Sequence, residues 1–126
     1  HANTATSITD IWYVSDSPVR DVEHFRRIHG DDAIQTQMGG FKIHTEKGVC
    51  HLLNDWAISE HFEGLAGLPS EPARAVALTL ACEDMAVAMS HWQEHSLPFV
   101  SLNAHEADIP PEVLGGTVLR FSQTTV

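Results

Sequence analysis

The sequence is poor in basic residues and has no apolar run long enough to cross a membrane. Lys and Arg number 7 against 17 Asp and Glu, which gives a formal net charge of −10. Nucleic-acid backbones and anionic membranes require clustered positive charge, and a membrane-spanning helix requires about 18–20 consecutive apolar residues. We therefore expect neither a nucleic acid nor a membrane as a partner.

Cysteine is also scarce, with only Cys50 and Cys82, each inside an apolar run. Two thiols without a short spacing make neither a zinc knuckle nor a disulfide framework. We interpret both as buried free thiols of a cytoplasmic protein, with one disulfide between them as the alternative. The N-terminus also lacks the basic-then-apolar segment of a secretion signal. Because the chain opens on His1 rather than Met, we expect a tag remnant, a processed end or a cut through a longer protein.

The first half of the chain predicts one helix among four strands, with a short helix after them. Hydrophobic residues make up 43% of the 126 residues, which suits a single domain, 1–126, with a core. Val19, Val22, Phe25 and Ile28 recur every three residues before Gly30, and this spacing indicates an amphipathic helix. The strands are expected at 8–14, 33–38, 41–45 and 49–54, and the short helix at 59–65.

The second half repeats this order after a loop-like linker at about 67–73. His24 falls on His91, 67 positions later, and the final strands align 69 positions apart. We therefore expect an α+β fold of two βαβββ modules, module 1 at about 7–66 and module 2 at about 74–124. The second module is expected to have a strand at 75–82, a helix at 85–95, and strands at 98–104, 106–109 and 117–123.

Residues 91–95, "HWQEH", match the H-x-x-E-H signature of a zinc peptidase helix. Apolar residues on the same predicted helix form one stripe, Met85, Ala88, Met89 and Trp92, and His91 lies well off it. Zinc also requires a third protein ligand, and no clear one follows in the sequence. We interpret the two histidines as residues of the surface or flank of a packing helix.

Two βαβββ units, with "LTLACEDMAVAMSHWQEHSLPF" in the second and the ending "IPPEVLGGTVLRFSQ", resemble the vicinal oxygen chelate superfamily. This superfamily includes glyoxalase I, extradiol dioxygenases, methylmalonyl-CoA epimerase and bleomycin resistance proteins. The resemblance is strongest to bacterial glyoxalase-like proteins, and it covers nearly the whole chain. It implies a curled, cup-shaped mixed sheet with the helices on its outer face.

The resemblance also implies four positions that can hold a divalent metal, on the first and last strand of each module. They correspond here to Asp10, His51, Ala77 and Arg120. Asp10 and His51 are candidate metal ligands, whereas Ala77 has no donor atom and the Arg120 guanidinium stays charged at ordinary pH. We therefore expect no metal cofactor, with a divalent metal as the alternative.

Strand alternation places further side chains on the expected concave face. Trp12 shares the face of Asp10, and Thr79 shares the face of Ala77. Asp10, Trp12, His51, Thr79 and Arg120 are therefore the candidate ligand-binding residues, and their mixture of apolar and polar groups suits a small organic molecule. An Asp10–Arg120 ion pair that fills a closed cup is an equal alternative.

Three functions remain open at this point. The chain is a metal-free module that binds a small molecule, a metal-dependent lyase, isomerase or dioxygenase, or the structural C-terminal half of a longer two-domain protein. Whether it is an enzyme is left open, and no catalytic residue is assigned. An isolated copy is expected to form a homodimer or to dock on a missing N-terminal domain, because either contact would cover exposed sheet edges.

Overall fold

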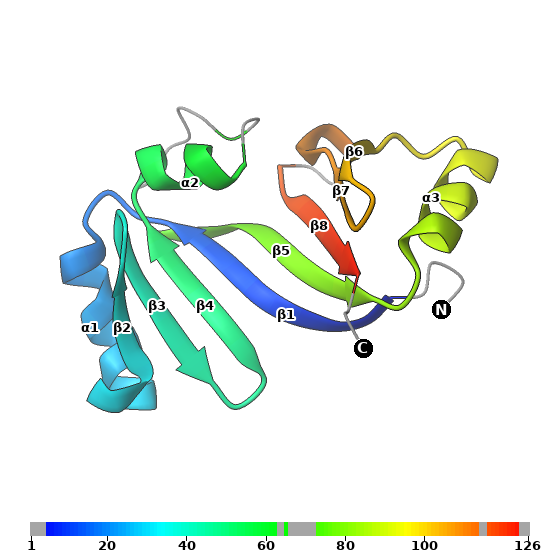
Figure 1. Ribbon diagram of the computed structural model, residues 1–126. Coiled ribbons are helices and arrows are strands. Elements are labelled where there is room, and N and C mark those ends of the chain that lie inside the picture. Colours follow the sequence, from blue (N-terminus) through cyan, green and yellow to red (C-terminus); the bar gives the residue numbers. More distant parts are fainter. Residues whose placement is uncertain (1–4, 63–64, 66–72, 114–115, 124–126) are drawn as a thin grey trace. The chain divides into compact units, whose positions relative to one another are not determined.

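A computed structural model describes residues 5–62, 65, 73–113 and 116–123 (Figure 1). The chain divides into a first unit, residues 10–76, and a second unit, residues 1–9 with 77–126. The strands β1 (Ala5–Val14) and β5 (Arg74–Cys82) each contribute residues to both units. The predicted module boundaries stay a prediction, and the linker predicted at 67–73 lies outside the described residues except for Ala73.

The first unit has the strand order β2-β3-β4-β1. β1 pairs with β4 in parallel, and the remaining neighbours pair antiparallel, so the sheet is mixed. The helix α1 follows β1, and its Val22 is buried against Ile43 and Leu52 of the sheet. The elements are α1 (Pro18–His29), a 3-10 turn (Asp31–Ala33), β2 (Ile34–Gln37), β3 (Gly40–Thr45), β4 (Gly48–Leu53) and α2 (Asp55–His61).

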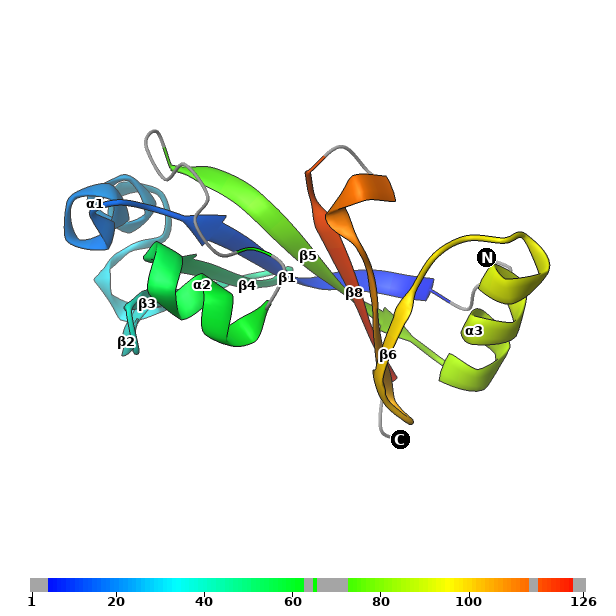
Figure 2. The same cartoon turned by 90° about the horizontal axis from the view of Figure 1, so that it is seen from above.

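The second unit repeats this arrangement in the strand order β5-β8-β7-β6. Its helix α3 lies beside β6, β7 and β8 in both ribbon views (Figure 2). The buried α3 side chains Met85, Ala88 and Trp92 pack with Ala107, Ile109 and Phe121 of the strands. The elements are α3 (Met85–Glu94), β6 (Val100–Asn103), β7 (Glu106–Ile109), a 3-10 turn (Pro111–Val113) and β8 (Val118–Gln123).

The strand registers of the two units confirm the predicted repeat. α3 begins at Met85, 67 positions after α1 begins at Pro18. Trp12 is the register partner of His51 in β1–β4, and Thr79 is the partner of Arg120 in β5–β8. Thr79 lies 67 positions after Trp12, and Arg120 lies 69 positions after His51, as the predicted repeat requires. The α+β fold with two βαβββ modules is therefore confirmed.

The predicted apolar stripe of α1 is only partly buried. Val22 is buried and Phe25 is half-buried, but Val19 is 73% exposed and Ile28 is 62% exposed. A spacing of three residues advances about 300° around a helix, so four such residues wind around it and the two outer ones lie on opposite sides. The central residues of the stripe alone face the sheet, and Ile28 is left exposed.

The second helix of the first unit begins earlier than predicted. We expected a helix at 59–65, whereas α2 spans Asp55–His61. The side chain of Asn54 accepts a hydrogen bond from the backbone N–H of Ala57 at 2.8 Å, which makes Asn54 the N-cap. No described helix is both long and apolar enough to cross a membrane.

Replacement of Gly40 by Ala is expected to destabilise the first unit. A Cβ at Gly40 would lie 1.9 Å from the carbonyl oxygen of Leu52, a backbone atom of the paired strand that cannot move alone. We expect Gly40→Ala to lower the free energy of unfolding by about 3 kcal/mol or more, measured by chemical denaturation. Gly116→Ala is the control, because a Cβ there meets nothing within 4 Å and costs only the strain of its positive φ, about 1–2 kcal/mol. Equal denaturation midpoints for Gly40→Ala and the wild-type protein would contradict the expectation.

Candidate functional site

The parallel pairing of β1 with β4 brings three of the predicted site residues together in the first unit. Trp12 and His51 are register partners. Asp10 precedes Trp12 by two positions, so alternation places both on the sheet face of His51. The predicted common face of Asp10, Trp12 and His51 is thus present within a single unit.

His51 is hydrogen-bonded through both ring nitrogens. Its Nε2 lies 2.7 Å from Oδ2 of Asp10, and its Nδ1 lies 3.0 Å from Oε1 of Gln37. The side chain of His51 is 6% exposed, whereas that of Asp10 is 26% exposed. An ionised carboxylate only accepts hydrogen bonds, so Nε2 is the nitrogen that donates to Asp10.

The amide of Gln37 can meet Nδ1 of His51 either as an acceptor or as a donor. With the amide oxygen toward Nδ1, both nitrogens donate and His51 is an imidazolium between two acceptors. With the amide turned, Gln37 donates to Nδ1 and His51 is neutral. The positions of the three side chains are the same in both arrangements.

Trp12 supports the imidazole from one side. The rings of Trp12 and His51 are stacked with centroids 3.7 Å apart and planes 8° apart. His61 and Phe62, from the end of α2 and the residue after it, lie against Trp12 at centroid distances of 4.8 and 5.1 Å. Because Trp12 is only 8% exposed, it orients His51 rather than presenting a free aromatic surface.

Thr79 and Arg120, the other two predicted site residues, belong to the second unit. They are register partners in β5–β8, and the backbone oxygen of Thr79 accepts a hydrogen bond from Thr9. Arg120 donates from Nε and Nη2 to the two carboxylate oxygens of Asp108, at 2.8 and 3.1 Å. This is the two-pronged geometry of a strong Arg–carboxylate pair, so the charge of Arg120 has a matching partner within its own unit.

Three residues of these groups were not predicted from the sequence: Gln37, His61 and Asp108. Asp108 could have been found from the sequence, since it is the antiparallel partner of Arg120 once the hairpin of β7 and β8 is aligned. Gln37 reaches His51 from β2, two strands away from β4. Its register partner on the intervening strand is Gly40, which has no side chain to obstruct it. That contact depends on strand order, for which the sequence carries no local signal.

The four positions implied by the superfamily resemblance do not make a set of four metal ligands. Asp10 and His51 carry lone pairs, but Ala77 has no donor atom and the guanidinium of Arg120 offers none. Within the described part of the chain, no three His, Cys, Asp or Glu side chains gather at one point. Of these four positions, only Asp10 and His51 carry donor atoms for a metal ion, which would replace their hydrogen bond.

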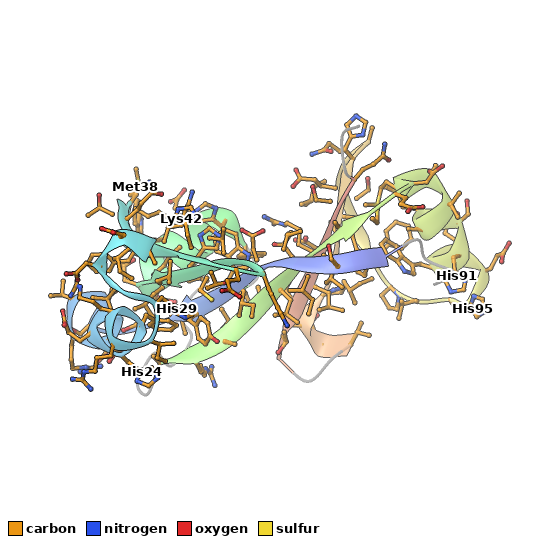
Figure 3. All side chains as sticks on the ribbon, turned by 90° about the horizontal axis from the view of Figure 1, so that it is seen from below. His24, His29, Met38, Lys42, His91 and His95 are labelled. Carbon is orange, nitrogen blue, oxygen red and sulfur yellow. The ribbon has the colours of Figure 1, made fainter. Side chains whose placement is uncertain are left out.

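The histidines of the "HWQEH" motif lie side by side on α3 (Figure 3). Their ring centroids are 4.3 Å apart, and Nδ1 of His95 lies 2.9 Å from the backbone oxygen of His91. His91 is half-buried and His95 is exposed, while the stripe of Met85, Ala88 and Trp92 packs into the core. The helix is thus a packing helix with its histidines on the surface and flank, as expected.

Both cysteines are free thiols, Cys82 buried and Cys50 half-buried. Cys50 packs with Val22 and Tyr13 on the α1 side of the sheet. Burial raises the pKa of the Cys50 thiol, and the charge of Asp10 raises it further. The thiol is therefore protonated at neutral pH and is a poor nucleophile.

Loss of His51 is expected to destabilise the protein. His51→Ala removes a stacked ring and leaves Asp10 without its histidine partner, so we expect a loss of about 2–4 kcal/mol in the free energy of unfolding. His44→Ala is the matched control, because His44 is an exposed histidine on β3 bonded to Gln35, and we expect a loss below about 0.5 kcal/mol. Denaturation followed by tryptophan fluorescence measures both, and equal losses would refute the structural role of His51.

Alkylation of Cys50 by iodoacetamide is expected to follow the raised pKa. The rate should inflect above pH 8.5, the usual value for a cysteine, because the thiolate forms only after the folded-state pKa is passed. Asp10→Asn should move the inflection to lower pH, since it removes the negative charge. Peptide-level mass spectrometry separates Cys50 from Cys82, and an inflection at or below pH 8.5 in the wild-type protein would contradict the expectation.

No protein-family model and no curated protein sequence matches the chain. Among solved structures, it is similar to methylmalonyl-CoA epimerase from Mycobacterium tuberculosis, with a TM-score of 0.65 at 10% identity over 100% of this chain and 97% of that one. A Streptomyces coelicolor methylmalonyl-CoA epimerase in complex with 2-nitronate-propionyl-CoA gives 0.57 at 11% identity, over 97% and 99%. A hypothetical protein from Bacillus halodurans gives 0.58 at 10% identity, over 95% of each chain. The chain therefore has the fold of the vicinal oxygen chelate superfamily.

Proposed function

We propose that the chain binds a small organic molecule at the group formed by Asp10, Trp12 and His51, without a metal ion. The observation that carries this proposal is the double engagement of His51, whose two ring nitrogens are bonded to Asp10 and Gln37. A histidine ligates a metal through an unprotonated nitrogen. Here a metal would have to displace one of these hydrogen bonds, and Ala77 and Arg120 would add no further ligand.

The exposure of the group supports a ligand that approaches Asp10. Trp12 and His51 are nearly covered, whereas the carboxylate of Asp10 keeps part of its surface open. A carboxylate accepts hydrogen bonds, so it favours a ligand with hydroxyl, amide or ammonium donors. Thr79 and Arg120 of the second unit, which the sequence pattern predicts as ligand-binding residues, remain part of this proposal. Because Asp108 is ion-paired with Arg120, that arginine does not by itself favour an acidic ligand.

The second candidate function is a metal-dependent reaction on an acyl-CoA thioester. The similarity to methylmalonyl-CoA epimerases favours it. Asp10 and His51, with donor atoms 2.7 Å apart, would hold the metal. A bound divalent ion would supply a Lewis acid that polarises a carbonyl oxygen.

We further propose that the protein is cytoplasmic and that it has a surface that binds another protein chain. Two free thiols are typical of a reducing compartment. β6 is the outermost strand in the order of the second unit, and its Val100 and Leu102 are 54% and 45% exposed. An outer strand with exposed apolar residues favours pairing with another chain, either a second copy or a preceding domain.

Metal analysis combined with thermal shift assays separates the two candidate functions. The purified protein is expected to hold no stoichiometric Zn, Mn, Fe, Co or Ni. A panel of small alcohols, amides, amines and methylmalonyl-CoA is expected to give at least one stabilising compound whose shift is unchanged by EDTA. Asp10→Asn, which keeps the shape of the side chain, should abolish that shift, and His44→Ala should keep it. Stoichiometric metal that is lost in Asp10→Asn, or a shift that requires added metal, would refute the metal-free proposal and favour the second candidate.

A further inference from the structure

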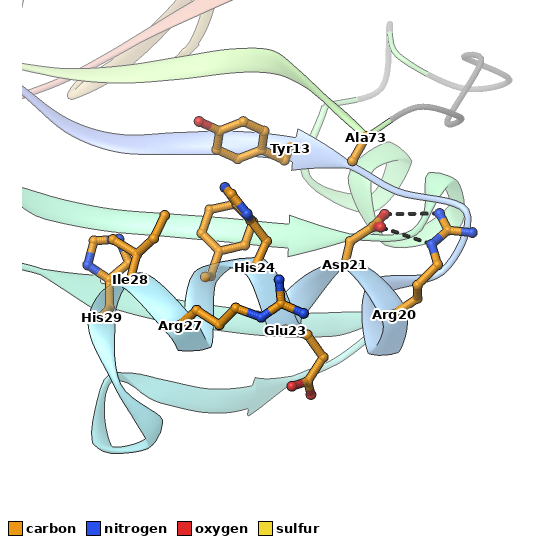
Figure 4. Close-up of a pocket in the computed structure, with 10 residues that line it drawn as sticks. Tyr13, Arg20, Asp21, Glu23, His24, Arg27, Ile28, His29 and Ala73 are labelled. Atoms are coloured by element: carbon orange, nitrogen blue, oxygen red, sulfur yellow. Dashed lines mark hydrogen bonds and ion pairs between the residues drawn. The ribbon is translucent and has the colours of Figure 1, made fainter.

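A depression of about 580 Å³ lies between β1 and α1 in the first unit (Figure 4). Tyr13 lines it from β1, and alternation places Tyr13 on the sheet face opposite Trp12 and His51. The depression is therefore separate from the Asp10–His51 group. Its volume falls in the range of pockets that bind small molecules, roughly 300–1,000 Å³.

The apolar part of the depression is made by an aromatic pair and an exposed aliphatic side chain. Tyr13 and Phe25 meet edge to face, with ring centroids 5.6 Å apart. Ile28 and Ala73 add aliphatic surface to the lining. Ile28 belongs to the predicted apolar stripe of α1, yet it is 62% exposed here. Ile28 therefore offers exposed apolar surface in the same lining as the aromatic pair, against which an apolar group of a ligand can pack.

The three arginines of α1 differ in their ion pairs. The helix carries three of the seven basic residues of an acidic protein. Two of the three are ion-paired with acidic neighbours, Arg20 with Asp16 and Asp21, and Arg26 with Glu23 and Asp31. Arg27 lines the depression and makes no ion pair or hydrogen bond with the residues that the structure describes.

Asp21 and Glu23 also line the depression, and each is ion-paired with an arginine that has a second acidic partner. The hydrogen bonds from Arg20 hold the pKa of Asp21 below its usual value, with a further contribution from Ser15. Asp21 is therefore ionised, and it shares Arg20 with Asp16. Glu23 is paired with Arg26. Among the charged side chains of the lining, Arg27 is thus the one that no carboxylate of the described residues holds.

Two further donors accompany Arg27. His24 extends from α1 toward the strand that carries Tyr13 (Figure 4). The hydroxyl of Tyr13 and the ring nitrogens of His24 have no hydrogen-bond partner within the described part of the chain. Burial raises the pKa of Tyr13, with a further contribution from Cys50, so its hydroxyl remains a donor at neutral pH.

We propose that this depression binds a small carboxylate that has an aromatic or branched apolar body. Arg27 receives the carboxylate in its two-pronged donor geometry, and Tyr13 or His24 donates an additional hydrogen bond. The apolar body lies against Phe25 and Ile28. The site is independent of the ligand proposed for the Asp10–His51 group.

A titration with phenylacetate followed by ¹H–¹⁵N NMR tests the proposal. We expect saturable shifts of the backbone amides of α1 and of Tyr13, and affinity at least tenfold weaker for phenylacetamide, which has the same body without the charge. Arg27→Gln should weaken phenylacetate binding at least tenfold. Lys47→Gln, which removes the same charge from the turn between β3 and β4, should leave it within twofold.

Three results of this titration would overturn the proposal. The proposal is refuted if the backbone amides of α1 do not shift at a phenylacetate concentration 20-fold above a millimolar dissociation constant. It is also refuted if phenylacetamide binds as tightly as phenylacetate, or if Arg27→Gln binds phenylacetate as the wild-type protein does. Asp10→Asn is expected to bind phenylacetate as the wild-type protein does. Failure of the metal-free proposal for Asp10 and His51 is thus distinguishable from failure of this one.

Discussion

The parallel pairing of the first and last strand of each unit is the constraint on which the rest of the structure depends. In the first unit it sets Trp12 opposite His51, and in the second it sets Thr79 opposite Arg120. Parallel neighbours require a long crossover, which the helix and hairpin between them supply in both units. A shift of one residue in either pairing would turn the site side chains to the opposite sheet face. The register therefore fixes both the core and the polar group at its edge.

The two units use this common geometry for different chemistry. In the first, a buried histidine lies between a carboxylate and an amide, and an indole ring holds its plane. In the second, the equivalent position carries an arginine that is held by a carboxylate from the adjacent hairpin strand. A buried polar group is tolerated only when its hydrogen bonds are satisfied. The described residues meet this condition, because their buried side-chain nitrogen and oxygen atoms all have hydrogen-bond partners.

Local patterns predicted the repeat, the strands and the common face of Asp10, Trp12 and His51, because strand alternation and helix periodicity depend only on neighbouring residues. Two local features were misjudged: the side chain of Asn54 starts α2 earlier than expected, and a three-residue spacing winds Val19 and Ile28 out of the core of α1. The partners of the polar residues were a different problem. Gln37 meets His51 across an intervening strand, and Asp108 meets Arg120 across a hairpin. Such contacts follow from strand order and register, which composition and periodicity do not determine.

The sharing of β1 and β5 between the units has a consequence for how the chain folds. Residues 5–9 lie with the second unit, and Thr9 bonds to Thr79, which is 70 positions further along. The sequence repeats are therefore not two autonomous folding segments. Completion of the second unit must close a loop that contains the whole of the first, and such non-local closure slows folding because its entropic cost precedes the contacts that compensate it. A protease cut in the segment joining the repeats would leave fragments that are each missing a strand segment of their own unit.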